Sequence, residues 1–345
     1  MTTPNHPRPG AQLPVRWGVL GAANIALKQV IPAMQLSGIS QIAAIASRDI
    51  KKARAAANAL GIPRAYGSYQ DLIADPDIDA VYNPLPNHLH VYWSIRAAEA
   101  GKHVLCEKPI ALTATEAREL LAVRDRTGVL IAEAFMVRAH PRWIAIRELV
   151  RNGRIGELKL IVGHFSYFRR DPRDIRSRVE WGGGALLDIG CYPTTLSRWL
   201  FDAEPLEVIA MVERDPEMGI DRLASALLHF PAGHATFTCA GQLVPYQRMQ
   251  IFGTAGRIEI EIPFNPPGDY RGRVFIDDGA DLRGSTVETV EFDAVNQYTL
   301  QGDRFSQAVR GTGTVPVPLE DAIKNMAVLD ALFRSAETRT WEKLL

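Results

Sequence analysis

Short apolar runs alternate with longer amphipathic segments from Val15 to about residue 135. The runs are rich in β-branched residues, which favours strands, and the segments between them have the apolar spacing of helices. The predicted strands lie in "VRWGVLG", "IAAIAS", "DAVYNPL", "KHVLCEKP" and "VLIAEAF". Continuous apolar strands separated by helices are typical of a parallel sheet covered on both faces. We therefore predict an α/β domain over residues 14–135.

After residue 136 the pattern changes to strands that follow one another directly. One helical pattern, "PRWIAIRELVRNGRIG", precedes a series of apolar strand patterns joined by turns. Consecutive strands without intervening helices indicate a mainly antiparallel sheet, so we expect an α+β domain over residues 136–345. Two helical patterns close the chain, and the second, residues 319–337, could return to pack on the first domain. The polar, proline-rich residues 1–13 are expected to be a disordered lead-in.

Composition excludes several classes of partner. Lys plus Arg and Asp plus Glu both total 39, so no overall basic field exists to hold nucleic acid or an anionic membrane. No apolar run is long enough for a membrane span, and no signal peptide is recognisable. Cys106, Cys191 and Cys239 lie far apart without CxxC spacing, which argues against disulfides or a zinc site. We expect reduced thiols in a cytoplasmic protein without a metal, and a small-molecule partner.

The first strand leads into "GAANIA", residues 21–26, and then into a helical pattern. A dinucleotide fingerprint has glycines here, which allow a tight turn and a close approach of backbone to a pyrophosphate. Only Gly21 is retained, and alanines occupy the other two positions. An ordinary turn between a strand and a helix is the alternative interpretation. The expected cofactor contacts in this turn are Gly21, Ala22, Ala23, Asn24 and Ile25.

The end of the second strand bears on the choice between NADP and NAD. The fingerprint expects an acid there if the ribose 2′-hydroxyl is bound, but the first polar residues are Ser47 and Arg48. A hydroxyl and a guanidinium suit a 2′-phosphate, since Arg donors match phosphate oxygens. We therefore predict NADP, with NAD as the alternative. Arg48 could also be a solvated residue that opens the next helix.

The third strand runs into the loop "NPLPNHLH" at the carboxyl end of the sheet, where ligands of such folds bind. Asn87 is expected to cap the following helix. His88 and His90 would allow a metal site, but the sequence offers no further ligand nearby, so we expect none. The expected cofactor contacts in this loop are Asn83, Pro84, Leu85, Asn87 and His88.

The fourth strand ends in Glu107, Lys108 and Pro109. Proline keeps the preceding residue extended, so Lys108 is expected at the mouth of the sheet, where a nicotinamide and its substrate would meet. We expect Lys108 to contact the cofactor.

Three stretches, "GAANIA", "CEKP" and "GGGALLDIGCY", occur in this order along the chain. Together they resemble the glucose–fructose oxidoreductase, inositol dehydrogenase and MocA family, and the resemblance covers essentially the whole chain beyond its N-terminal residues. "RWGVLGAANIA" and "DIGCYP" are most similar to the branch that holds NADP-dependent D-xylose dehydrogenases, dimeric dihydrodiol dehydrogenases and glucose–fructose oxidoreductase.

The resemblance implies a Rossmann domain followed by an α/β domain whose open antiparallel sheet carries the substrate and often an oligomer interface. We therefore expect a homodimer or homotetramer formed through the C-terminal sheet. The resemblance also implies that Lys108 precedes a cis proline, that Glu107 lies by the nicotinamide, and that Lys108, Asp188 and Tyr192 form the catalytic set. Many members carry histidine at the last position, and tyrosine is found in the aldose and dihydrodiol branch.

The chemistry of hydride transfer needs a group that takes or gives the hydroxyl proton. A free tyrosine has a pKa of about 10, which is high for a base near neutrality. We expect the Lys108 ammonium to lower the pKa of Tyr192 and Asp188 to orient the pair or bind a substrate hydroxyl. The alternatives are a half-buried aromatic for Tyr192 and an N-terminal helix cap for Asp188.

Further substrate contacts are expected just before the glycine run. Tyr167 and Phe168 alternate along a predicted strand, so only one can face the pocket, and we select Phe168. Arg169 could line a polyol pocket or belong to a solvated loop, and Trp181 could offer a flat face to a sugar ring or simply be buried. The expected substrate-binding residues are Phe168, Arg169, Trp181, Asp188 and Tyr192.

These residues predict an oxidoreductase that moves a hydride between NADP and a sugar or cyclic polyol. The leading reaction is oxidation of an aldose at C1 to a lactone, and oxidation of a trans-dihydrodiol or another ring carbon is the alternative. A non-catalytic NADP-binding regulator is the alternative of a different class. The joint presence of Lys108, Asp188 and Tyr192 argues against it.

Overall fold

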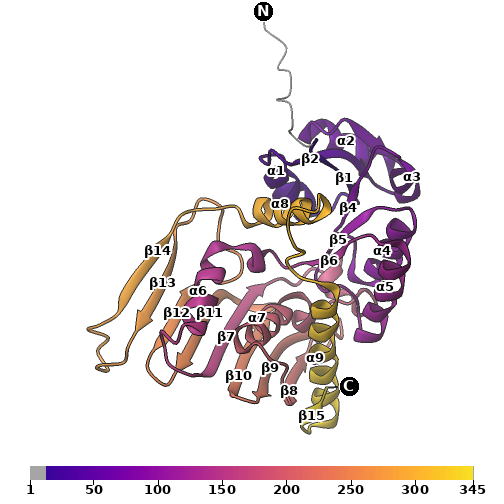
Figure 1. Cartoon of the computed structure of the whole chain (residues 1–345). Helices are drawn as coiled ribbons and strands as arrows, with labels where there is room; N and C mark the ends of the chain where they lie inside the picture. Colours follow the sequence, from indigo (N-terminus) through magenta and orange to yellow (C-terminus); the bar gives the residue numbers. More distant parts are fainter. Residues whose placement is uncertain (1–12, 345) are drawn as a thin grey trace, which may run out of the picture.

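The computed structural model describes residues 13–344, so nearly all of the expected lead-in lies outside the described residues. Two β-sheets stand side by side, and helices pack on both (Figure 1). Among the helices within residues 13–344, none combines the length and the apolar character needed to cross a bilayer.

The first sheet confirms the predicted parallel architecture. Its six strands run in the order β3-β2-β1-β4-β5-β6, and every neighbouring pair is parallel. Residues of α3, α4 and α5 share one apolar core with one face of the sheet, and residues of α1 and α2 share another with the opposite face. The strands are β1 (Val15–Leu20), β2 (Ser40–Ala46), β3 (Arg64–Tyr66), β4 (Ala80–Asn83), β5 (His103–Glu107) and β6 (Ile131–Ala134).

Five α-helices lie between these strands: α1 (Ile31–Met34), α2 (Ile50–Leu60), α3 (Tyr69–Ala74), α4 (His90–Glu99) and α5 (Ala114–Thr127). Side chains cap the N-termini of three of them, α2, α3 and α5. The Asp49 carboxylate accepts the Lys51 N–H at 2.9 Å, and the Ser68 hydroxyl accepts the Asp71 N–H at 3.0 Å. Such caps satisfy backbone donors that have no partner inside the helix.

The second sheet has nine strands in the order β14-β13-β12-β11-β7-β10-β9-β8-β15, and only β7 and β10 form a parallel pair. It is therefore mainly antiparallel, as predicted. The strands are β7 (Leu158–Phe168), β8 (Glu207–Arg214), β9 (Asp221–Phe230), β10 (Gly233–Ala240), β11 (Gln242–Gly253), β12 (Arg257–Glu261), β13 (Gly272–Asp277), β14 (Glu288–Phe292) and β15 (Glu342–Lys343).

The register of this sheet separates a buried face from an open one. One row of paired residues across the strands is buried and apolar throughout: Val208, Leu228, Ala235, Ile161, Ile251, Ile258 and Ile276. The adjacent row is only half-buried: Ile209, Leu227, Thr236, Val162, Gln250, Glu259 and Phe275. Three helices lie beside this sheet (Figure 1): α6 (Pro141–Arg151), α7 (Cys191–Phe201) and α9 (Leu319–Thr338).

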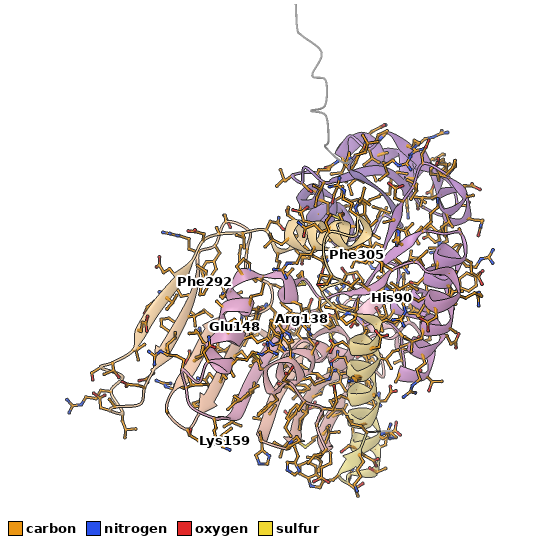
Figure 2. The ribbon with its side chains drawn as sticks, in the orientation of Figure 1. His90, Arg138, Glu148, Lys159, Phe292 and Phe305 are labelled. Atoms are coloured by element: carbon orange, nitrogen blue, oxygen red, sulfur yellow. The ribbon has the colours of Figure 1, made fainter. Side chains whose placement is uncertain are left out.

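The two closing helices return to the first sheet. Helix α8 (Gln297–Val309) lies against α1, and the Trp17 indole of β1 donates to the Ser306 hydroxyl at 3.1 Å. The Phe305 ring, labelled in Figure 2, packs against Trp17 with ring centroids 5.5 Å apart. Helix α9 packs between α5 and β8, and the Asp330 carboxylate accepts the Ala114 N–H at 2.8 Å.

We expect Phe305→Ala to lower the free energy of unfolding by about 3–5 kcal/mol, because Phe305 is fully buried against Trp17 and its loss leaves a cavity. Urea denaturation measures the change. Leu36→Ala is the control, since Leu36 is 78% exposed, and it should change the stability by no more than about 0.5 kcal/mol. Equal effects of the two substitutions would show that α8 does not depend on this contact.

Candidate active site

A cavity of about 490 Å³ opens beyond the carboxyl ends of β4 and β5. Both sheets contribute to its walls: the first through Pro84, Leu85 and Lys108, and the second through β7 and β11. The structure therefore brings together side chains that are far apart in the sequence, such as Lys108 and Asp188, which are 80 positions apart.

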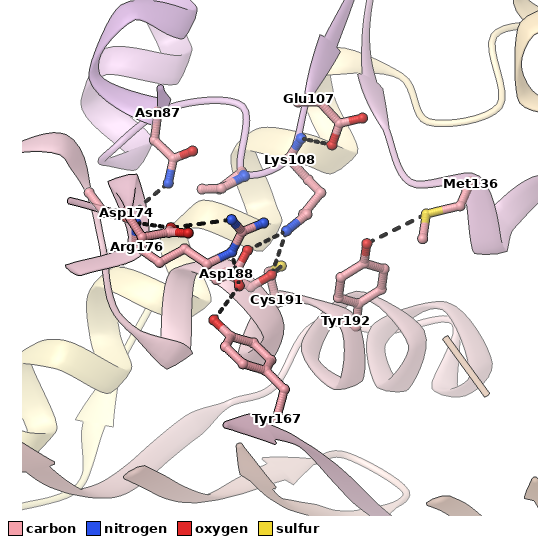
Figure 3. Close-up of polar contacts among 12 residues, drawn as sticks. Asn87, Glu107, Lys108, Met136, Tyr167, Asp174, Arg176, Asp188, Cys191 and Tyr192 are labelled. Carbon is pink, nitrogen blue, oxygen red and sulfur yellow. Dashed lines mark hydrogen bonds and ion pairs between the residues drawn. The ribbon is translucent and has the colours of Figure 1, made fainter. Parts of the chain in front are cut away.

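The Lys108 ammonium and the Asp188 carboxylate form an ion pair at one wall of this cavity (Figure 3). Lys108 Nζ lies 3.0 Å from Asp188 Oδ1 and 2.6 Å from the Asp188 carbonyl oxygen. Both side chains are only 12% exposed. Lys108 follows β5 directly, and Asp188 lies in η6 (Leu186–Gly190), a π-helical turn that leads into α7. The Lys108–Pro109 peptide bond is cis, as the resemblance implied.

The second oxygen of Asp188 has partners that the sequence analysis did not assign. The Tyr167 hydroxyl donates to Asp188 Oδ2 at 2.7 Å, and Arg176 Nε donates to the same atom at 2.8 Å (Figure 3). Strand alternation showed that either Tyr167 or Phe168 would face the pocket but not which of the two. No local pattern distinguishes Arg176 from the other arginines of its loop.

These contacts keep both members of the pair charged. Burial opposes ionisation of Asp188, but Arg176, Lys108 and Tyr167 hold the pKa of its carboxyl well below the ordinary range. Burial likewise opposes the charge on Lys108, but Asp188, Cys191 and Glu107 together outweigh it and raise the pKa of the ammonium. Asp188 is therefore not a helix cap here, since its carboxylate binds side chains from three separate segments.

The selection of Phe168 as a pocket residue was wrong. Phe168 is 65% exposed at the end of β7, whereas Tyr167 lines the cavity. The two side chains point to opposite faces of the strand, and the structure puts Tyr167 on the side of Asp188. Arg169 lines the cavity too, and it forms an ion pair with Asp174.

Tyr192 lines the cavity, but its ionisation differs from the expectation. The ring is 4% exposed and packs against Phe135, Phe165 and Phe264. Its hydroxyl donates to Met136 Sδ at 3.5 Å, and Lys108 Nζ lies 5.3 Å from the ring centroid (Figure 3). Burial raises the pKa of Tyr192 well above 10, so the prediction that Lys108 lowers it was wrong for this arrangement.

The segment before Asp188 crosses from the second domain to the first. Asn87 Nδ2 donates to the Gly182 carbonyl at 2.8 Å, and the His88 ring stacks on Trp181 with centroids 5.6 Å apart. Trp181 lines the cavity while one of its faces is taken by His88. The expected cap by Asn87 is wrong, because its amide holds this crossing segment and α4 begins without a side-chain cap.

Asp221 anchors the turn that carries Asp188. This buried carboxylate at the start of β9 accepts the Leu186 N–H at 2.5 Å. Gly184 passes so close to Asp221 that any Cβ would overlap the carboxylate, and its φ is +117°. Only glycine fits both constraints, which explains one residue of the "WGGG" run.

The predicted cofactor turn begins at a position where glycine is required. Gly21 has φ +94°, and a Cβ there would lie 2.9 Å from Leu85 Cδ2. Ala22 and Ala23 are half-buried, Asn24 is exposed, and Ile25 lines the cavity. Gly21 is therefore needed here for its positive φ and for the packing of Leu85 against it.

The end of β2 places Arg48 beside this turn. Burial raises the pKa of the Tyr69 hydroxyl, and the nearby Arg48 guanidinium partly opposes this shift. Ser47 is buried, and its hydroxyl accepts the Asp49 N–H at 3.3 Å. Arg48 itself is exposed, so it can contact a ligand that lies over the end of β2.

Asn83 does not face the cavity, which corrects its assignment as a cofactor contact. It is fully buried, its amide donates to the His90 carbonyl and to Ser94, and its oxygen accepts the Leu85 N–H. These bonds shape the β4 loop from inside. Pro84, Leu85 and Asn87 line the cavity instead.

Glu107 lines the cavity and accepts the Tyr82 hydroxyl at 2.6 Å. Burial raises the pKa of this carboxyl, and Lys108 opposes the shift.

The histidines of the β4 loop do not form a metal site. Both ring nitrogens of His90 lie 2.7 Å from backbone carbonyls, those of Leu85 and Pro109. No group of three or more potential ligands that could hold a metal occurs within residues 13–344. Cys106, Cys191 and Cys239 are free and buried.

Comparison with known proteins matches both halves of the chain to one family. Residues 15–135 match the oxidoreductase family with an NAD-binding Rossmann fold, and residues 143–259 match the GFO/IDH/MocA C-terminal domain. The chain is 49% identical to an uncharacterised oxidoreductase from Rhizobium meliloti, covering 95% of this chain and 98% of the relative. It is 38% identical to D-xylose 1-dehydrogenase (NADP(+)) 2 from Haloferax volcanii, covering 93% and 97%.

Among solved structures, the chain is similar to a 3-ketoreductase from Actinomadura kijaniata in complex with NADP and TDP-benzene. The TM-score is 0.86 at 31% identity, covering 93% of this chain and 98% of the other.

Asp221 gives the fold a pH dependence. Burial raises the pKa of its carboxyl to about 6, although the Leu186 N–H lowers it. Because this value exceeds the unfolded pKa of about 3.9, the folded state binds the proton more tightly. The protonated Asp221 carboxyl therefore stabilises the fold at low pH, and this contribution is lost as the pH rises through about 6.

We expect Asp221→Asn to remove this contribution, because the amide does not titrate. The free energy of unfolding of the wild type minus that of the variant should be about 2 kcal/mol larger at pH 4 than at pH 7. Urea denaturation at a series of pH values measures it. A difference that stays constant with pH would contradict the assignment to Asp221.

Proposed function

The chain belongs to the glucose–fructose oxidoreductase, inositol dehydrogenase and MocA family, and on this premise we propose that it is an NADP-dependent oxidoreductase acting on an uncharged sugar or cyclic polyol. The leading reaction is oxidation of an aldose at C1 to the lactone. The observation that carries the proposal is the Lys108–Asp188 ion pair, 3.0 Å long, beside Tyr192 in a cavity built from both sheets.

Lys108 and Asp188 supply a fixed charge at the site. The ammonium can stabilise the negative charge that develops on the substrate oxygen, and Asp188 keeps that ammonium protonated. Tyr167 and Arg176 fix the carboxylate from the far side, so the charge needs little reorganisation during the reaction. The bound nicotinamide supplies the acceptor or donor of the hydride.

Tyr192 is proposed to carry the hydroxyl proton. With its raised pKa the phenol is protonated near neutrality and can donate a proton to a carbonyl oxygen, which serves the reducing direction. In the oxidising direction the phenol must first give up its proton, and an approach of the Lys108 ammonium to its hydroxyl would favour this by lowering its pKa.

The residues around the cofactor turn fit a dinucleotide. The turn after β1, which begins at Gly21 with φ +94°, would hold a pyrophosphate, and Arg48 and Ser47 would take a 2′-phosphate. Ala22, Ala23, Asn24 and Ile25 belong to the same turn, while Pro84, Leu85, Asn87, His88 and Glu107 would line the nicotinamide half. The NADP named for the D-xylose relative and the ketoreductase structure supports the choice over NAD.

An uncharged substrate is favoured over a nucleotide-linked sugar by the charges of the loop. Every arginine from residue 169 to 178 lies within 4.0 Å of a carboxylate, so none is left over for a diphosphate. The pairs are Arg169–Asp174, Arg170–Glu217, Arg173–Asp171, Arg176–Asp188 and Arg178–Glu180. Neutral hydroxyls could instead bind the carboxylates and Trp181.

A homo-oligomer formed through the second sheet is part of the proposal. The half-buried row contributes Ile209, Leu227, Val162 and Phe275 to the open face, with Thr236, Gln250 and Glu259 between them, and a second copy could cover this face. A cytoplasmic location agrees with three free cysteines, all buried.

The substrate is tested by turnover of free pyranoses, inositols, trans-dihydrodiols and dTDP-sugars with each nicotinamide cofactor. We expect an absorbance change at 340 nm with a free pyranose and NADP, and a lactone as the product. Turnover of nucleotide-linked sugars alone would overturn the uncharged substrate. Tighter binding of NADH than of NADPH, measured by fluorescence titration, would overturn the cofactor assignment.

We expect Tyr192→Phe to lower kcat by about 100-fold or more, because general acid–base catalysis contributes at least this much. The melting temperature should hardly change, since the lost hydroxyl makes a weak, 3.5 Å bond to Met136 Sδ. Tyr92→Phe is the control, because Tyr92 is 57% exposed, and it should keep wild-type kcat. A fully active Tyr192→Phe enzyme would remove Tyr192 from the mechanism.

A further inference from the structure

The turn that follows Lys108 is held by two buried side chains from neighbouring elements. The Pro109 carbonyl lies 2.7 Å from His90 Nδ1, and the Ile110 N–H donates to Glu133 Oε1 at 2.8 Å. Glu133 lies on β6, next to β5, where it pairs in register with Cys106. A carboxyl group on the adjacent strand thus fixes the backbone two residues beyond the ammonium.

The proposed chemistry does not use Glu133. The residue is 2% exposed, it does not line the cavity, and its Oε2 atom has no hydrogen-bond partner among the described residues. Burial raises the pKa of this carboxyl to about 8, Asp321 acts in the same direction, and Arg198 and Lys108 oppose it. A protonated, uncharged Glu133 is therefore compatible with this interior position near pH 7.

Other buried polar atoms without partners come from the helices behind Glu133. Thr195 and Arg198 lie four and seven residues after Cys191, on one face of α7, and α9 meets this face. Asn325 donates to the Cys191 carbonyl at 3.5 Å, and Arg198 pairs with Asp321. The unpartnered atoms are Glu133 Oε2, Thr195 Oγ1, Arg198 Nη1 and Asn325 Oδ1. Buried polar atoms of this kind are the usual partners of ordered internal water.

We propose that Glu133 is a positioning residue for Lys108: its carboxyl fixes the turn over residues 108–110 through the Ile110 N–H. The inference rests on the proposed catalytic role of Lys108. Because a shift of about 1 Å in a catalytic group can cost about 100-fold in rate, a fixed turn matters for turnover. The ion pair with Asp188 sets the tip of the side chain, and Glu133 sets its backbone.

Two substitutions separate this role from general packing. Glu133→Gln keeps an oxygen that can accept the Ile110 N–H, whereas Glu133→Leu keeps the bulk without an acceptor. Thr195→Val is the matched control, because it removes another unpartnered polar atom of the same interior without touching the turn. We expect Glu133→Leu to lower kcat about 10- to 100-fold in the folded fraction. Glu133→Gln and Thr195→Val should stay within about threefold of wild type.

NMR of the Lys108 side chain gives a readout that does not need turnover. In lysine-labelled protein the Lys108 signal should move in Glu133→Leu and stay in place in the other two variants, with folding checked by thermal denaturation. A folded Glu133→Leu protein with wild-type kcat and an unmoved Lys108 signal would overturn the proposal. If the signal moves as expected but the wild-type protein oxidises no sugar or polyol, the proposed function fails while the positioning role stands.

Discussion

The structure of the site depends on one constraint: Lys108 and Asp188 are both buried, and each needs the other to remain charged. An isolated ion in a protein interior costs several kcal/mol, and a pair is tolerated only when its remaining hydrogen-bonding capacity is used. Asp188 meets this condition because both of its carboxylate oxygens are bound. Lys108 binds one oxygen, and Tyr167 and Arg176 bind the other. The pair also joins the two domains, because its members come from β5 and η6.

Much of the surrounding chain serves to bring Asp188 to Lys108. The segment before η6 is attached to the first domain by the Asn87–Gly182 bond, and Asp221 holds the start of the turn. Gly184 permits the close passage past Asp221. On the other side, His90 and Glu133 hold the backbone after Lys108. The Lys108–Asp188 ion pair therefore lies between two buried carboxyl groups, Asp221 and Glu133, which hold the backbone on either side of it.

Local patterns in the sequence predicted the fold well. Strand and helix periodicity identified the parallel and antiparallel sheets, and the family motifs placed Lys108, Asp188 and Tyr192 at one cavity. The errors concern orientation. Phe168 was preferred to its neighbour Tyr167, because alternation shows that two adjacent strand residues face opposite ways without showing which way is inward.

Other features were outside the reach of any local pattern. Arg176 is one of several arginines in its loop, and only the path of the chain puts its Nε 2.8 Å from Asp188. Asn83 stands at the predicted ligand edge, but its amide turns inward to Ser94. The pKa of Tyr192 depends on how deeply the three phenylalanines enclose it and on where the Lys108 ammonium points.

The sequence by itself determined the order of elements, the family and the identity of the reactive groups, because these follow from periodicity, spacing and side-chain chemistry. The tertiary structure alone decided which groups touch, which oxygen of Asp188 each cation binds, and which carboxyls hold a proton. Hydrogen bonding and ionisation depend on distances of a few ångströms and on burial, and the chain sets both only when segments far apart in the sequence pack together.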